Sequence, residues 1–327
     1  MLSIFGGRDE GLNELMAAVR AYFITHASRY GLHPELQVNY VLNEGGFVNH
    51  SFRITDGVRS FHLKLATSEH SHAELLRWQR VGAQLERYRA PGIISWVDVG
   101  AAGGLLFNSA PGVIPYLDDA VLHEVLAVTR ALNADCELAD ILRDDAQRTT
   151  RDVYFASYHE RFVEDLKYIR GARPPFVAGQ LIDWLMDEAD RLAKIVVRSA
   201  AFDQPADQPT HGDLWLNNIL WQNSEHWHIV DWDGIALGDP MTDLAMLTGP
   251  AANDLTPLKM YDQVAAQLSS VERERLRILG RASLLDWIID PLSDWIDADV
   301  VPAHAQEMRA LKERVHTGAL ALYRELY

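Results

Sequence analysis

The pattern of apolar and polar positions changes twice along the 327-residue chain. Near the N-terminus, apolar residues recur at spacings of three and four between Leu12 and Phe23, which predicts an amphipathic helix ending near Gly31. From residue 37 to residue 66, short apolar runs alternate with turn-forming Gly, Asn and Asp. This second pattern predicts a meander of antiparallel strands.

A helical period returns over residues 70–89, and two further strand patterns lie within residues 93–110. Beyond Pro111 the chain is mainly helical, apart from two polar segments that interrupt the helices. This order of elements predicts an α+β fold. We expect a small β-rich N-terminal lobe formed by residues 1–110 and a larger helical C-terminal lobe formed by residues 111–327.

Composition and charge place the chain among soluble globular proteins. Hydrophobic residues make up 48% and charged residues 23% of the sequence, and no segment approaches the roughly 18 consecutive apolar residues of a membrane span. A net charge of −16 disfavours nucleic acid or an anionic membrane as a partner and would attract a cationic substrate. The same acidity can also serve solubility alone.

Cysteine usage indicates the compartment. Cys136 is the single cysteine, so no intramolecular disulfide can form, and we expect it to be a small core residue. Together with the absence of a signal-peptide pattern at the N-terminus, this favours a cytoplasmic protein. The oligomeric state is left open by the sequence.

Polar residues suited to phosphoryl transfer gather in the C-terminal half. Asn218 follows Asp213 by five residues, and Asp231 follows Asn218 by thirteen, at the end of an apolar strand. A carboxylate can orient an incoming hydroxyl and accept its proton, while an amide oxygen and a second carboxylate are hard ligands for Mg²⁺. Alternatively, these carboxylates together with His211 and Asp233 could hold two cations in a metallohydrolase.

The segment His211-Gly212-Asp213, followed after four residues by Asn218, resembles the catalytic loop of the aminoglycoside phosphotransferase and choline kinase group, relatives of protein kinases. The resemblance covers residues 37–250 and implies a bilobal protein-kinase-like fold. It implies that Asp213 is the catalytic base and that Asn218 and Asp231 bind Mg²⁺.

Two further features of this half belong to the same resemblance. The form Asp231-Trp232-Asp233 replaces the Asp-Phe-Gly of protein kinases and looks like that of small-molecule kinases. The resemblance also implies that His211 braces the catalytic loop and that Asp243 holds the backbone amides of that loop.

The resemblance requires three features of the N-terminal half, and candidates for all three occur in order. Gly45 and Gly46 would let backbone N–H groups approach phosphate oxygens, although such a pair is also typical of a simple hairpin. Lys64 would reach the α- and β-phosphates, or would be an exposed strand lysine. Glu74, with Glu69 as the rival, would pair with Lys64. The backbone near Asn108 and Ala110 would contact the adenine.

An acidic segment near the C-terminus is the candidate for substrate recognition. Asp286, Asp290 and Asp294 are interleaved with Trp287 and Trp295, and an indole face beside carboxylates can bind an ammonium group. Alternatively, the tryptophans pack in a helical core and the aspartates face water.

These observations predict a phosphotransferase that uses ATP and Mg²⁺ to phosphorylate a hydroxyl of a small molecule. The acceptor is expected to carry an amine, as aminoglycosides, choline, thiamine or homoserine do, or to be sugar-like. A nucleotide-binding regulator without turnover and a protein kinase are the alternatives.

Overall fold

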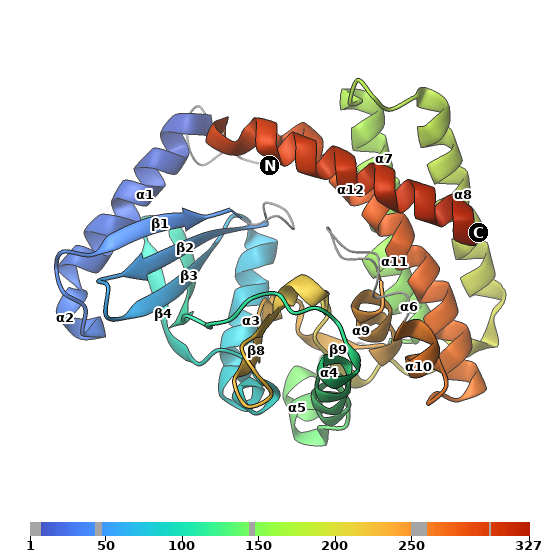
Figure 1. The fold of residues 1–327 in the computed structure, drawn as a ribbon, viewed down its shortest axis with the longest axis horizontal. Coiled ribbons are helices and arrows are strands. Elements are labelled where there is room, and N and C mark those ends of the chain that lie inside the picture. Colours follow the sequence, from blue (N-terminus) through green and yellow to red (C-terminus); the bar gives the residue numbers. More distant parts are fainter. Residues whose placement is uncertain (1–7, 43–47, 144–147, 250–259, 301) are drawn as a thin grey trace. The chain divides into compact units, whose positions relative to one another are not determined.

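The computed structural model describes residues 8–42, 48–143, 148–249, 260–300 and 302–327 (Figure 1). The chain divides into two compact units, each assembled from separate stretches of sequence. The first unit contains Met1–Val113, Leu220–Asp233 and Asp299–Ala305, and the second contains Ile114–Ile219, Gly234–Ala298 and Gln306–Tyr327. The Asp231-Trp232-Asp233 segment therefore belongs to the unit that also contains Lys64.

The first unit is built on a five-stranded antiparallel sheet with the strand order β1-β2-β3-β5-β4. Its strands are β1 Gln37–Val41, β2 Asn49–Thr55, β3 Ser60–Ala66, β4 Ile93–Val99 and β5 Ala102–Asn108. Strand β3 is central, and Lys64 lies opposite Ser51 of β2 and Leu105 of β5. The predicted meander is confirmed.

Helices cover both faces of this sheet. Successive strand residues point to opposite sides, so each face carries side chains that a helix can pack against. They are α1 Arg8–Thr25, α2 Ala27–Tyr30 and α3 Glu69–Leu85. On one face, Val19 and Phe23 of α1 share a core with Leu63 of β3. On the other face, the Lys64 ammonium lies 5.9 Å from the ring centre of Trp78 in α3. The sheet thus places Lys64 on the α3 side.

Local hydrogen bonds fix where α3 begins. The Ser68 hydroxyl accepts the Ser71 N–H at 3.1 Å, and the Ser71 hydroxyl accepts the Ser68 N–H at 3.1 Å, which forms a capping box. The helix then buries Leu75 and Trp78 against the sheet and brings Glu74 to its partly buried edge. The predicted helix following the third strand is confirmed.

The second unit is mainly helical, as predicted. Its helices are α4 Asp119–Asn133, α5 Cys136–Leu142, α6 Thr150–Tyr154, α7 Glu160–Ala172, α8 Gly179–Arg198, α9 Pro240–Leu247, α10 Tyr261–Ala265, α11 Ser270–Asp297 and α12 Ala305–Leu326. A π-helical turn, Phe155–His159, joins α6 to α7. Strand β6 Gln208–Thr210 pairs with β9 Ala236–Gly238, and this two-stranded sheet leads into the loop that carries Asp213.

Two sequence expectations about surface and membrane can be compared with this fold. Cys136 is exposed, so its prediction as a core residue was wrong: it occupies the first position of α5, whose buried residues begin at Leu138. Among the described residues, the helices lack the combination of length and apolar character that crossing a membrane requires.

Candidate active site

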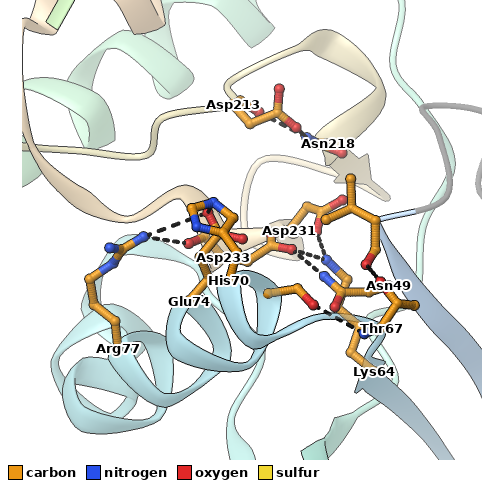
Figure 2. Close-up of polar contacts among 12 residues, drawn as sticks. Asn49, Lys64, Thr67, His70, Glu74, Arg77, Asp213, Asn218, Asp231 and Asp233 are labelled. Atoms are coloured by element: carbon orange, nitrogen blue, oxygen red, sulfur yellow. Dashed lines mark hydrogen bonds and ion pairs between the residues drawn. The ribbon is translucent and has the colours of Figure 1, made fainter. Parts of the chain in front are cut away.

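Lys64 is the centre of a charged cluster in the first unit. Its side chain is only 7% exposed, and its ammonium forms ion pairs with Asp231 and with Oδ2 of Asp233, the latter at 2.8 Å (Figure 2). Burial lowers the pKa of Lys64, but the two carboxylates outweigh burial and raise its pKa. The lysine therefore stays charged despite its burial.

The Asp231-Trp232-Asp233 segment has the local structure needed to hold two carboxylates near one cation. Trp232 is fully buried, and its indole N–H donates to the Ile229 carbonyl at 2.6 Å. Asp231 has a φ of 70°, a left-handed conformation that non-glycine residues seldom adopt and that is often found at functional sites. The buried indole thus anchors the segment between the two carboxylates.

Asp233 is held by more than Lys64. Its Oδ2 also accepts a hydrogen bond from the Asn49 amide at 2.9 Å, and its backbone carbonyl accepts one from Arg77 at 3.2 Å. Burial and the neighbouring Asp233 carboxylate raise the pKa of Asp231 to about 7. Burial also acts to raise the pKa of Asp233, but Lys64 and hydrogen bonds lower it to about 2. Asp233 is therefore the carboxylate that stays ionised.

The structure gives Lys64 different partners from the predicted Glu74. Glu74 lies 3.2 Å from the His70 ring and 3.9 Å from Arg77, and among the described residues neither Glu74 nor the rival Glu69 forms an ion pair with Lys64. The physical reason is that a buried ammonium needs buried, close compensating charge, which the Asp231-Trp232-Asp233 segment supplies. Glu74 instead contacts His70 and Arg77 of its own helix.

The remaining N-terminal candidates are a glycine pair and a strand end. Gly45 and Gly46 lie outside the described residues. Asn108 ends β5, where its N–H donates to the Gly92 carbonyl at 3.1 Å, and the next N–H, of Ser109, donates to Ser60 at 3.3 Å. Ala110 follows, partly exposed.

Asp213 and Asn218 are brought together in the second unit, as Figure 2 shows. The Asn218 amide N–H₂ donates to both the backbone carbonyl of Asp213, at 2.8 Å, and its carboxylate, at 3.0 Å. The amide oxygen of Asn218 accepts no hydrogen bond within the described part of the chain. The side chain thus fixes the Asp213 carboxylate while leaving one hard oxygen ligand available.

The loop that carries Asp213 is held by its backbone. Asp243, fully buried near the start of α9, accepts the N–H of His211 at 2.8 Å and of Gly212 at 2.9 Å. Gly212 has a φ of 85°, and a Cβ there would lie 2.4 Å from the Gly234 carbonyl oxygen, so only glycine fits. His211 in turn accepts the Asp213 N–H at 3.2 Å. Both predicted bracing roles, of Asp243 and His211, are confirmed.

The three candidate substrate aspartates lie on α11 and have cationic neighbours that the sequence analysis missed. Arg161 of α7 lies 2.6 Å from Asp286 and 3.6 Å from Asp290, and Lys312 of α12 pairs with Asp294. Burial raises the pKa of Asp286 to about 6 and that of Asp294 to about 7. Of the three, Asp290 has the most exposed side chain, at 39%.

The two tryptophans of this segment differ in their surroundings. Trp287 packs edge to face against Trp215 of the catalytic loop, with ring centres 5.0 Å apart. Trp295 has the guanidinium of Arg309 over its ring at 5.0 Å and Phe176 at its edge. A protein cation therefore already occupies the face of Trp295, whereas Trp287 ties α11 to the loop that carries Asp213.

Comparison with known proteins agrees with this geometry. The profile of the phosphotransferase enzyme family (APH) matches residues 40–279. The chain belongs to the phosphotransferase enzyme family. The predicted family and the prediction of a small-molecule phosphotransferase are confirmed. Membership of this family also argues against the alternative of a metallohydrolase. No curated protein matches the sequence.

Solved structures confirm the fold class of this phosphotransferase. An aminoglycoside phosphotransferase in complex with GDP and kanamycin has a TM-score of 0.61 and 15% identity, covering 93% of this chain and 99% of its own. Choline kinase from Cryptosporidium parvum has a TM-score of 0.55 and 14% identity, and the match covers 94% of this chain and 95% of the kinase. Ethanolamine kinase from Plasmodium vivax has a TM-score of 0.54 and 14% identity, and the match covers 98% of this chain and 91% of the kinase. The fold is the bilobal protein-kinase-like fold, with a small antiparallel sheet and a larger helical part.

Proposed function

We propose that this phosphotransferase moves the γ-phosphate of ATP, in a Mg²⁺-dependent reaction, to a hydroxyl of a small amine-bearing molecule. The observation that carries this proposal is the arrangement of the catalytic loop, where Asn218 orients the Asp213 carboxylate and Asp243 fixes the backbone that carries it. Phosphoryl transfer depends mostly on such positioning and on charge stabilisation. We also propose residues 1–110 and 111–327 as the two lobes along the sequence, with the short segments Leu220–Asp233 and Asp299–Ala305 of the second stretch belonging to the compact unit of the first.

Asp213 is the proposed catalytic base. Its carboxylate would accept a hydrogen bond from the acceptor hydroxyl, orient that oxygen toward the γ-phosphorus, and take the proton as the new P–O bond forms. The bond between the γ-phosphorus and the bridging oxygen of ATP breaks in the same step, and ADP leaves. The amide of Asn218, at 3.0 Å, limits rotation of the carboxylate. Because two backbone N–H groups hold the loop on Asp243, little reorganisation is needed when substrate binds.

Asn218 and Asp231 are the proposed Mg²⁺ ligands. The donor set fits, since Mg²⁺ prefers hard oxygen ligands, and these are provided by a carboxylate and by an amide oxygen that accepts no hydrogen bond from the described residues. A bound Mg²⁺ would neutralise negative charge on the phosphates. This chain's own contribution is to hold the Asn218 side chain by two hydrogen bonds.

The nucleotide would be held by groups of the first unit. We propose that Lys64, kept charged in its cluster by Asp231 and Asp233, contacts the α- and β-phosphates, with Gly45 and Gly46 covering the phosphates. Glu74, whose partners are His70 and Arg77, is not proposed as the partner of Lys64. Backbone groups near Asn108 and Ala110 would contact the base. Solved relatives in the fold comparison contain GDP, ADP or AMP-PNP, which supports a nucleotide here.

The acceptor is proposed to be a cationic small molecule recognised near α11. Asp286, Asp290 and Asp294 remain the candidates, and Asp290 is the foremost because the other two carboxylates are largely buried beside Arg161 and Lys312. Trp287 links this segment to the catalytic loop. Kanamycin is bound in one neighbour, and others are choline and ethanolamine kinases, so amine-bearing acceptors are the first to test.

The test is ADP release with Mg·ATP and a panel of amino alcohols, sugars and aminoglycosides. Asp213→Asn should lower kcat by about 10²–10⁴-fold on the accepted substrate, the usual contribution of a positioned base. Asp187→Asn, on the exposed surface of α8, is the matched control and should leave kcat unchanged. Equal turnover by the wild type and Asp213→Asn would refute the assigned base. Absence of a thermal shift with millimolar Mg·ATP would count against nucleotide binding altogether.

A further inference from the structure

We propose that Asp233, rather than Glu74, is the positioning residue that holds Lys64 for the nucleotide. This inference rests on the proposed function and concerns the nucleotide half of the site. It differs from the arrangement expected from the sequence, in which a glutamate of α3 pairs with the lysine.

The first observation is the number of independent contacts that fix Asp233. Its Oδ2 lies 2.8 Å from the Lys64 ammonium and 2.9 Å from the amide nitrogen of Asn49, and Arg77 binds its backbone carbonyl at 3.2 Å. These partners come from β3, β2 and α3. A residue held from three elements, through both its carboxylate and its backbone carbonyl, offers a fixed anchor for an ammonium group, as a preorganised site requires.

The second observation is where Glu74 directs its charge. Its nearest partners are the His70 ring, whose side chain is 83% exposed, at 3.2 Å, and the Arg77 guanidinium at 3.9 Å. Arg77 is also the donor to the Asp233 carbonyl. Glu74 therefore contacts Arg77 and not Lys64, and its charge acts on Asp233 and Lys64 only from a longer distance.

The third observation separates Asp233 from its neighbour Asp231, which also pairs with Lys64. Asp231 is the proposed Mg²⁺ ligand, so its carboxylate would be shared between that ion and Lys64. Asp233 additionally has the Asn49 amide on the oxygen that faces Lys64. Asp233 is thus the anchor that Lys64 keeps when Asp231 is engaged.

The experiment compares Asp233→Asn with Glu74→Gln, two near-isosteric removals of charge, in the wild-type chain and in Lys64→Met. ADP affinity is measured by calorimetry in the presence of Mg²⁺. We expect Asp233→Asn to weaken ADP binding about tenfold, a typical coupling for residues in one network, and Glu74→Gln to change it little. In Lys64→Met, Asp233→Asn should have no further effect. The KM for ATP should rise with Asp233→Asn while the KM for the acceptor stays unchanged, a split that a general loss of structure would not produce.

A second measurement needs no nucleotide. Urea unfolding of the single and double variants gives the coupling between Lys64 and each carboxylate, and we expect about a tenfold coupling in the unfolding equilibrium constant for Asp233 and a smaller one for Glu74. Additive effects of Lys64→Met and Asp233→Asn, or a larger loss of ADP affinity with Glu74→Gln, would overturn this inference while the proposed function stands. A wild-type chain that neither binds ADP nor transfers phosphate would overturn the proposed function, and this inference with it.

Discussion

A buried ammonium of Lys64 meets the partly buried carboxylates of Asp231 and Asp233, which lie 167 and 169 residues away in the sequence, whereas the loop around Asp213 is held by hydrogen bonds to its backbone. In the first region a buried cation compensates two carboxylates that are largely, but not fully, removed from water. In the second, one buried carboxylate accepts two backbone N–H groups and a neutral amide orients the reacting group. The first region should therefore respond mainly to changes of charge, and the second to changes of hydrogen-bond acceptors.

Removing the cation from the charged region should have the largest effect on stability. Lys64→Met leaves the Asp231 and Asp233 carboxylates without compensation, and breaking a buried ion pair costs about 3–5 kcal/mol of unfolding free energy. Urea unfolding at pH 8 measures this loss. Lys194→Met, on the exposed surface of α8, is the matched control. Similar losses in the two variants would contradict a charge-held cluster.

Changing the acceptor in the second region should have the next largest effect. Asp243→Asn replaces one of the two oxygens that accept the His211 and Gly212 N–H groups by a donor, which leaves a buried N–H unpaired at a cost of about 1–3 kcal/mol. Asp118→Asn is the control, because Asp118 also accepts two backbone N–H groups but is exposed at the N-cap of α4, where Asn serves as well as Asp. Equal losses of unfolding free energy in Asp243→Asn and Asp118→Asn would mean that burial of the loop does not raise the cost of replacing its acceptor.

The sequence predicted the second region better than the first, for a physical reason. The contacts of Asp213 with Asn218 and His211 span at most five residues, so spacing alone indicates them. The alternation of β3 likewise predicts which face Lys64 occupies. The choice of partner for Lys64 depends on how a segment 167 residues away packs against β3, which no local pattern records.

The same limit explains the cations that the sequence analysis missed on α7 and α12. Asp286 and Asp294 belong to an acidic run, and local pattern predicts acidic groups exposed to solvent or substrate. Arg161 and Lys312 reach them only because the helices pack together. Burial then makes a paired cation necessary, since unpaired buried charge is costly. Tertiary packing, and not composition, therefore determines how much of the negative charge on α11 is left unpaired by Arg161 and Lys312.

The pH dependence of the second region gives a smaller effect with a defined sign. Burial raises the pKa of Asp243 to about 6 from its ordinary 3.8, despite its two hydrogen bonds to the backbone. The folded state then binds more protons than the unfolded state between these values, so the contribution of Asp243 to stability is present at low pH and is lost as the pH rises through 6. Asparagine does not titrate.

The difference in unfolding free energy between the wild type and Asp243→Asn should therefore shrink by about 1 kcal/mol from pH 5 to pH 7. Urea unfolding of both chains at several pH values measures it, and groups common to both chains cancel in the difference. A difference that grows with pH would show that the two N–H groups outweigh burial at this carboxylate.

The smallest effect should come from a hydrogen bond in the charged region. Asn49→Ala removes the bond to Asp233, worth about 1.5–3 kcal/mol with a charged acceptor, but it also removes the Asn49 amide oxygen, which is buried without a partner among the described residues. Because relieving an unsatisfied buried group gains a similar amount, we expect a net loss below about 1 kcal/mol.

Asn133→Ala is the control for that variant. Its amide donates at 2.7 Å to the neutral Pro209 carbonyl, and removing it relieves no such buried oxygen, so the expected loss is about 1 kcal/mol. Asn49→Ala, which loses a hydrogen bond to a charged acceptor, should thus lower the unfolding free energy no more than Asn133→Ala, which loses one to a neutral carbonyl. If Asn49→Ala instead costs well above 2 kcal/mol in urea unfolding, hydrogen bonding and not charge would be what holds Asp233 against Lys64.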